Sequence, residues 1–172
     1  MTVEQDSTIH IDATEDSETG RPECIVAWGG WAGTFPLEKI RSTAEALFAA
    51  AAAAECDAAL IAELRAGLQL PDEVIGVMLG KVRERRPLPA GTFLRIEAGV
   101  SASTGLPFVK VRQGSNAGQL SPDEAKAMGR QWLASAEAAE HDAITRYVLR
   151  DSGRNPVEVE DFFRAMAALR RG

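Results

Sequence analysis

The sequence is poor in the residues from which metal and redox sites are built. It contains two cysteines and two histidines in 172 residues. Cys24 and Cys56 are too far apart for C-x-x-C spacing, so neither a zinc site nor a redox pair is predicted. We expect both to be free thiols in a reducing compartment, and we predict no metal and no other cofactor.

Long apolar runs are also lacking. The longest, ALFAAAAAA at 46–54, is about half of the ~20 residues that a membrane span needs. The first residues, MTVEQDSTIH, are acidic and have no apolar stretch like that of a signal peptide. We therefore expect a cytoplasmic protein with no membrane partner.

Motifs for catalysis and nucleotide binding are absent as well. The glycine turns GGWAG (29–33) and GSNAG (114–118) lack the spacing of dinucleotide or phosphate loops. No G-x-S-x-G nucleophile motif occurs. The net charge of −6 argues against a nonspecific nucleic-acid binder, which is usually basic. These absences favour a protein that is not an enzyme and leave an enzyme as an open alternative.

What the sequence does contain is an internal repeat. AAECDA (53–58) and AAEHDA (138–143) lie 85 positions apart. Shifting the chain by that distance aligns residues 8–86 with 93–171 without a gap and gives 23 identities in 79 pairs. The matched positions include glycines and prolines that do not depend on the abundance of alanine. We interpret the pattern as a tandem duplication.

The repeat divides the chain into four parts. Residues 1–6 form a short tail, 7–86 the first repeat, 87–91 a Pro/Gly linker and 92–172 the second repeat. The alanine runs lie at matching places in the two repeats, and small side chains let helices approach closely. We therefore expect the two repeats to pack into one compact domain.

Each repeat reads as three strands followed by two helices. In the second repeat, alternating apolar residues predict strands, and Ser121 with Glu124 predicts a capping box that begins a long helix. Its expected inward positions include Trp132, Ala136, Ala139 and Tyr147. The predicted strands are 8–12, 23–28, 34–35, 93–98, 108–112 and a short one after 113–118; the predicted helices are 37–66, 71–85, about 122–149 and 157–171.

The fold class predicted is therefore α+β, a tandem duplication of a β-β-β-α-α unit with a period of 85 residues. The two units are expected to form a pseudo-twofold arrangement, with two three-stranded antiparallel sheets and four helices. The long helices are expected to cross where the alanine runs at 49–54 and 134–139 let them approach closely.

The first function hypothesis is a non-enzymatic cytosolic adaptor or regulatory protein that binds another protein, or itself as a homodimer. Its candidate binding residues are Ile25, Trp28 and Trp31. They lie where the first repeat is apolar and the second is polar or basic, and exposed apolar patches are typical of partner surfaces. The alternative is that other parts of the chain cover these residues.

The second hypothesis is a nucleic-acid-binding regulator. Arg95, Lys110 and Arg112 alternate along two predicted strands and would form a basic strip on one sheet face. Some regulators place strands in a DNA groove. A solvated strand face is the structural alternative.

The third hypothesis places a small-ligand site or an active site at the seam between the repeats. Two acids recur in both copies, Glu55 with Asp57 and Glu140 with Asp142. Carboxylates that meet across a pseudo-twofold axis can do acid–base work. Ion pairs with Arg65 and Arg150 are the structural alternative.

The stretch GQLSPDEAKAMGRQWLASAEAAEHDA (118–143) resembles a pattern in uncharacterised proteins of actinobacteria and their phages. In that pattern a turn, Q-L and S/T-P-x-E-A precede a helix rich in Ala and Glu. The first repeat departs from it, with TFPLEKI in place of QLSPDEA. The resemblance implies an origin and a cytoplasmic compartment, and it implies no activity.

Overall fold

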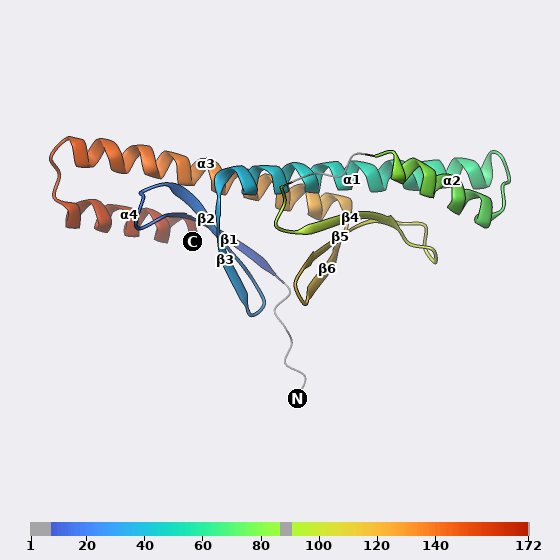
Figure 1. The fold of residues 1–172 in the computed structure, drawn as a ribbon, viewed down its shortest axis with the longest axis horizontal. Helices are drawn as coiled ribbons and strands as arrows, with labels where there is room; N and C mark the ends of the chain where they lie inside the picture. Colours follow the sequence, from blue (N-terminus) through green and yellow to red (C-terminus); the bar gives the residue numbers. More distant parts are fainter. Residues whose placement is uncertain (1–7, 87–90, 172) are drawn as a thin grey trace, which may run out of the picture.

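The structure, a computed structural model, describes residues 8–86 and 91–171. The predicted tail at 1–6 and all but the last residue of the predicted linker lie outside these ranges. The elements follow the order β-β-β-α-α twice (Figure 1). They are β1 (Ile9–Glu15), β2 (Pro22–Trp28), β3 (Trp31–Pro36), α1 (Leu37–Ala66), α2 (Asp72–Glu84), β4 (Arg95–Val100), β5 (Pro107–Gln113), β6 (Asn116–Leu120), α3 (Pro122–Asp151) and α4 (Pro156–Arg171).

The α+β class, the two three-stranded antiparallel sheets and the four helices are confirmed. The third strands are longer than predicted, because each begins inside a segment that was predicted to be a turn. Gly29 and Gly114 adopt φ of 57° and 56°, a left-handed conformation that glycine takes without strain. Each therefore closes a tight two-residue turn, and the chain returns to strand at Trp31 and Asn116.

In each sheet the strands follow chain order, β1-β2-β3 and β4-β5-β6. Side chains alternate between the two faces of a strand. On β2 the residues Cys24, Val26 and Trp28 are buried, whereas Ile25 is exposed. One face of the sheet therefore meets the helices and the other faces outward.

The start of α3 is set by the predicted capping box, which is confirmed. Ser121 Oγ accepts a hydrogen bond from the Glu124 backbone N–H, and a Glu124 carboxylate oxygen accepts one from the Ser121 N–H at 2.7 Å. The corresponding helix α1 begins after Pro36 without a side-chain cap. This cap lowers the pKa of the Glu124 carboxyl group.

Each long helix packs mainly on the sheet of the other half of the chain (Figure 1). Helix α3 contacts β1 and β2, whereas α1 contacts β4 and β5, and the two helices pack against each other. A Cβ atom added at Gly129 on α3 would lie 3.2 Å from the Ala44 carbonyl oxygen on α1. The halves therefore share a core, which includes Val26, Leu47, Val109, Val111 and Trp132.

The inward face of α3 was predicted correctly at Trp132, Ala136 and Ala139, which are all buried. It was wrong at Tyr147, which is 72% exposed. Adjacent helical residues point about 100° apart, and Arg146 takes the inward direction at this turn, with its side chain only 15% exposed. Within the described residues, no helix has both the length and the apolar character that a membrane span requires.

Candidate functional site

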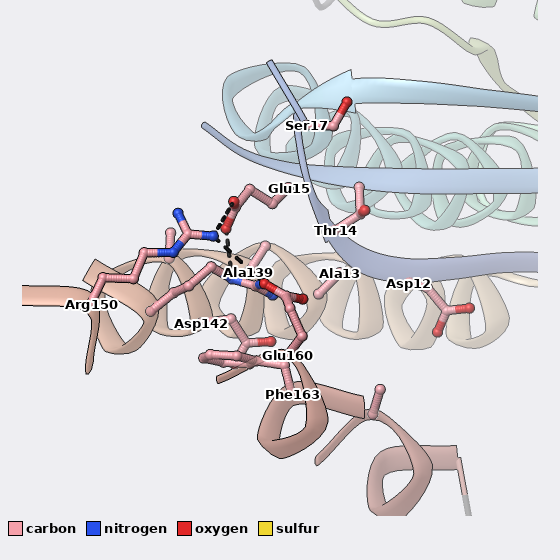
Figure 2. Close-up of a pocket in the computed structure, with 13 residues that line it drawn as sticks. Asp12, Ala13, Thr14, Glu15, Ser17, Ala139, Asp142, Arg150, Glu160 and Phe163 are labelled. Carbon is pink, nitrogen blue, oxygen red and sulfur yellow. Dashed lines mark hydrogen bonds and ion pairs between the residues drawn. The ribbon is translucent and has the colours of Figure 1, made fainter. Parts of the chain in front are cut away.

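A cavity of about 480 Å³ lies between β1, α3 and α4 (Figure 2). We call it the β1–α4 groove. Its volume falls within the range of roughly 300–1,000 Å³ that is usual for ligand pockets. It is lined by Asp12, Ala13, Thr14, Glu15, Ser17, Ala139, Asp142, Ala143, Arg146, Arg150, Glu160, Phe163 and Ala167.

Helix α3 supplies one wall of the groove. Its lining residues follow the three- and four-residue spacing of a single helical face. Small side chains at Ala139 and Ala143 leave the space open, and the charged residues come one or two turns later, at Arg146 and Arg150. Helix α4 supplies a second wall with the same spacing, through Glu160, Phe163 and Ala167.

One edge of strand β1 lines the groove. Four consecutive residues, 12–15, line the cavity. Side chains of a strand alternate between faces, so consecutive residues line one cavity only if the strand lies edge-on to it. Within the described residues β1 is hydrogen-bonded to β2 alone. The edge toward the groove therefore carries backbone groups that take part in no sheet pairing.

Arg146 is the centre of the charged part of the groove. Its Nε lies 2.8 Å from Glu15 Oε2 in an ion pair, but the N–H is not aligned for a hydrogen bond. Its Nη1 donates a hydrogen bond to Glu160 Oε1. The guanidinium carbon lies 4.2 Å from the centroid of the Phe163 ring, within cation–π range. One side chain thus joins β1, α3 and α4.

Arg150 is held more loosely. Its Nη2 lies 3.8 Å from Glu15 Oε1 and 3.6 Å from Glu160 Oε1, beyond hydrogen-bond distance. Its side chain is 53% exposed. Figure 2 shows Arg150 and Glu15 pointing toward one another across the mouth of the groove. An exposed cation at this distance can be displaced at little cost.

The charges that line the groove sum to a negative value. Asp12, Glu15, Asp142 and Glu160 contribute four carboxyl groups, against two guanidinium groups. The hydrogen bond from Arg146, followed by the charges of Arg146 and Arg150, lowers the pKa of Glu160, so this carboxyl group is ionised at neutral pH. Among the described residues, no three or more His, Cys, Asp or Glu side chains are grouped to hold a metal ion.

The three predicted partner-binding residues do not share one surface. Ile25 lies on the outer face of its sheet and is exposed. Trp28 is 4% exposed and belongs to the core. Trp31 pairs with Trp28 across the sheet, so both point inward, and Trp31 stacks against Phe93. Trp28 is thus covered internally and Trp31 is partly covered, whereas Ile25 is exposed.

The predicted basic strip lies on one face but is interrupted. Arg95 is directly opposite Arg112, and Lys110 is directly opposite Glu97, all on the outer face of the second sheet. Arg95 Nε donates a hydrogen bond of 2.7 Å to Glu97 Oε1. The acid in the middle of the strip reduces its positive potential, and nucleic-acid binding stays a prediction.

The four acids predicted at the seam do not form one site: the two glutamates lie in ion pairs between the long helices, and the two aspartates lie elsewhere. Glu55 pairs with Lys126 at 2.6 Å, and Glu140 pairs with Arg41 at 2.5 Å, each across the two long helices. Neither lines the β1–α4 groove. The predicted alternative partners, Arg65 and Arg150, pair elsewhere: Arg65 with Asp72 of α2, and Arg150 with Glu15 and Glu160.

The two aspartates of the seam set differ from the glutamates and from each other. Asp57 is 1% exposed and accepts hydrogen bonds from Arg83 and Arg86 at 2.8 and 2.9 Å. Asp142 lines the groove. The sequence analysis thus named one residue of the groove, Asp142, but assigned it to a site at the seam between the repeats.

Among the groove residues that were not predicted to be functional are Glu15, Arg146, Glu160 and Ala167. For Glu15 and Arg146, the alignment of the two repeats contained information that could have identified them. In the 85-residue alignment Glu15 meets Val100 and Arg146 meets Ile61, so charge replaces an aliphatic residue at both positions. Differences between the copies therefore carried more information about the site than the identities did.

Comparisons of the chain with protein-family models, with curated proteins and with solved structures find no match.

Proposed function

We propose that the protein is a non-enzymatic binding protein that holds an extended segment of a partner protein in the β1–α4 groove. The observation that carries this proposal is the edge-on position of β1 along the groove. A strand edge with unpaired N–H and C=O groups binds an extended peptide as an added strand. Four lining residues at about 3.3 Å each offer roughly 13 Å of such edge.

The surroundings of the edge support peptide binding over catalysis. The two arginines of the groove are engaged with carboxylates, and within the described residues its lining includes no histidine, cysteine or lysine. Glu15 and Glu160, two of its four carboxyl groups, are held in ion pairs with Arg146, which disfavours a role for them as a catalytic base. Side-chain pockets beside an added strand supply specificity, and the charged walls of α3 and α4 are placed to do so.

The test is selection of peptides from a random displayed library on the folded protein. Binding of the selected peptides is then compared in two variants that add the same side chain at adjacent positions of α4. Ala167→Trp fills the groove, because Ala167 lines it. Ala168→Trp adds the same bulk on the exposed side of the helix.

We expect the selected peptides to bind the wild type and Ala168→Trp alike and to lose at least about tenfold in affinity for Ala167→Trp, a difference of about 1.4 kcal/mol. N-methylation of alternate peptide backbone nitrogens should also weaken binding, because an added strand donates through those groups. If no peptide distinguishes the two variants, the groove is not a peptide site.

We also propose that the chain arose by duplication and is a fused, pseudo-twofold pair. Two reciprocal ion pairs support this. Arg41 and Lys126 are 85 positions apart, as are Glu55 and Glu140, and the pairs run 41 to 140 and 126 to 55. A twofold axis relates two such contacts to each other. A crystal structure tests the idea: superposing 9–66 on 94–151 should need a rotation close to 180°.

A further inference from the structure

Helix α2 has an exposed apolar face. The helix packs on α1, and its Ile75 and Leu79 are buried. Four further apolar side chains of the same 13-residue helix are exposed. They are Val74, Val77, Met78 and Val82. Exposed apolar side chains that gather on one element are typical of an interaction surface. We call these four residues the apolar face of α2.

The corresponding face of α4 is charged. Burial aligns the two short helices with an offset of 84, because Ile75 matches Val159 and Leu79 matches Phe163, all four buried. The offset is one less than 85 because α2 begins six positions after the end of α1, whereas α4 begins five positions after the end of α3. Two exposed valines of α2 then match two exposed acids of α4: Val74 with Glu158, and Val77 with Asp161. The fold thus accepts acids at these places, and the valines of α2 need another reason.

Two charges flank the apolar face in an order that is complementary to itself. Glu73, Val77 and Lys81 are four residues apart, so they lie in one row along the helix. All three are exposed. The acid lies one turn before the valine, and the base lies one turn after it. Two antiparallel copies of this row therefore place each acid opposite a base.

These two charges are not used within the part of the chain that the structure describes. Asp72 and Arg83 of the same helix form ion pairs with residues of α1. Among the described residues, neither Glu73 nor Lys81 takes part in an ion pair. Both are therefore available to a second molecule.

Two glycines lie beside the row and leave room for another helix. A Cβ atom added at Gly76 or at Gly80 would meet no atom within 4 Å, so both glycines face open space. The distance between packed helices depends on the side chains at their contact, and glycine lets two backbones come close. Glycine also lowers the stability of a helix relative to alanine, so the isolated fold gains nothing from these two.

We infer that the protein forms a homodimer in which the α2 helices of two copies pack antiparallel about a twofold axis at Val77. Val77 meets Val77 of the second copy, and Glu73 of each copy pairs with Lys81 of the other. A twofold interface requires a surface that is complementary to itself, and this row has that property. A helix of 13 residues is about 20 Å long, so the contact is small and the dimer is weak and reversible.

This dimer goes beyond the proposed peptide site and does not depend on it. Helices α2 and α4 lie at opposite ends of the molecule (Figure 1). Pairing through α2 therefore leaves the β1–α4 groove of each copy open. One dimer then offers two grooves, which strengthens binding to a partner that carries two suitable segments.

Sedimentation equilibrium of the full chain tests the inference, because it gives the dimer Kd. Val77→Glu places two like charges at the axis and should raise this Kd at least about tenfold. Val148→Glu on α3 is the control, because Val148 is 56% exposed and Val77 is 61% exposed; it should leave the Kd unchanged. A wild type that stays monomeric at roughly 1 mM, or equal effects of the two variants, overturns the inference. Loss of the dimer in Val148→Glu alone assigns the contact to α3 and overturns it as well.

Charge reversals test the antiparallel register. Glu73→Lys and Lys81→Glu each place like charges opposite one another twice and should raise the Kd roughly threefold to tenfold. Glu158→Lys, the same change on α4, should not. An equimolar mixture of the first two variants should dimerise as tightly as the wild type, because each reversed charge then faces the reversed charge of the other variant. A mixture that dimerises no more tightly than the single variants overturns the inferred register.

Discussion

The two ends of the molecule use the same arrangement of long helix, short helix and sheet edge, yet one end is closed and the other open. At the α1–α2 end, Arg83 and Arg86 cover Asp57. At the α3–α4 end, Ala167 and Asp142 face a cavity, and Arg146 is held between Glu15 and Glu160 beside it. The acid of the closed end is thus covered by two arginines, whereas the corresponding acid of the open end lines a cavity.

The charged residues of the open end are not required by the fold. In the 85-residue alignment, Glu15 and Arg146 correspond to Val100 and Ile61, which are both half-buried. Replacing a buried ion pair by well-packed apolar residues is often neutral or stabilising. The presence of charge at one end and aliphatic residues at the other is therefore consistent with the proposed binding role.

The comparison predicts unequal effects of one substitution made at both ends. Asp57→Asn leaves Arg83 and Arg86 without their carboxylate and should lower the free energy of unfolding by roughly 2 kcal/mol, since both arginines are partly exposed and regain some hydration. Asp142→Asn should lower it by less than about 1 kcal/mol, because Asp142 is only half-buried and its interactions are more screened by water. Urea unfolding of both variants measures the difference. Equal losses would mean that the two ends are alike.

The closed end can also be opened. Arg83→Ala removes one of the two donors to Asp57 and should cost about 1–2 kcal/mol. Propylguanidinium should restore part of this loss, because a ligand that binds only the folded state stabilises it by mass action. The measurement is the rise in Tm of the variant with added propylguanidinium, compared with the rise in the wild type. The same rise in both proteins would show that no guanidinium site was created.

The secondary structure could be read from the sequence because local chemistry determines it. Alternating residues such as Val109 and Val111, the Ser121–Glu124 cap and the glycines of the turns each act within a few positions. Periodicity shows which face of a helix is apolar but not which element covers that face. The packing of α3 on β1 and β2, and the burial of Trp28 beside Gly118 of the other sheet, could not be predicted for this reason.

The groove could not be recognised from the sequence because the connection between α3 and α4 is one residue shorter than the connection between α1 and α2. Because α4 begins one position early relative to α2, a gapless alignment pairs Ala167 with Val82 and Arg83 with Ala168. The correspondence between Arg83 and Ala167, a residue of the groove, is shifted by one position in that register and points to the exposed Ala168 instead. It becomes visible only when burial aligns Phe163 with Leu79.

The smallest effect concerns pH and again separates the two short helices. The hydrogen bond from Arg146 lowers the pKa of Glu160 below its usual value. A carboxyl group whose pKa is lowered by folding stabilises the fold above its unfolded pKa, and this contribution is lost as the pH falls through the folded pKa. The attachment of α4 should therefore weaken in acid, by less than about 1 kcal/mol because Glu160 is half exposed. Amide hydrogen exchange, corrected for the intrinsic effect of pH, reports this as a loss of protection in α4 that Glu160→Gln abolishes. If the pH dependence persists in Glu160→Gln, the dependence arises from another group. If α2 loses protection equally, the ion pair of Arg146 does not distinguish the open end from the closed one.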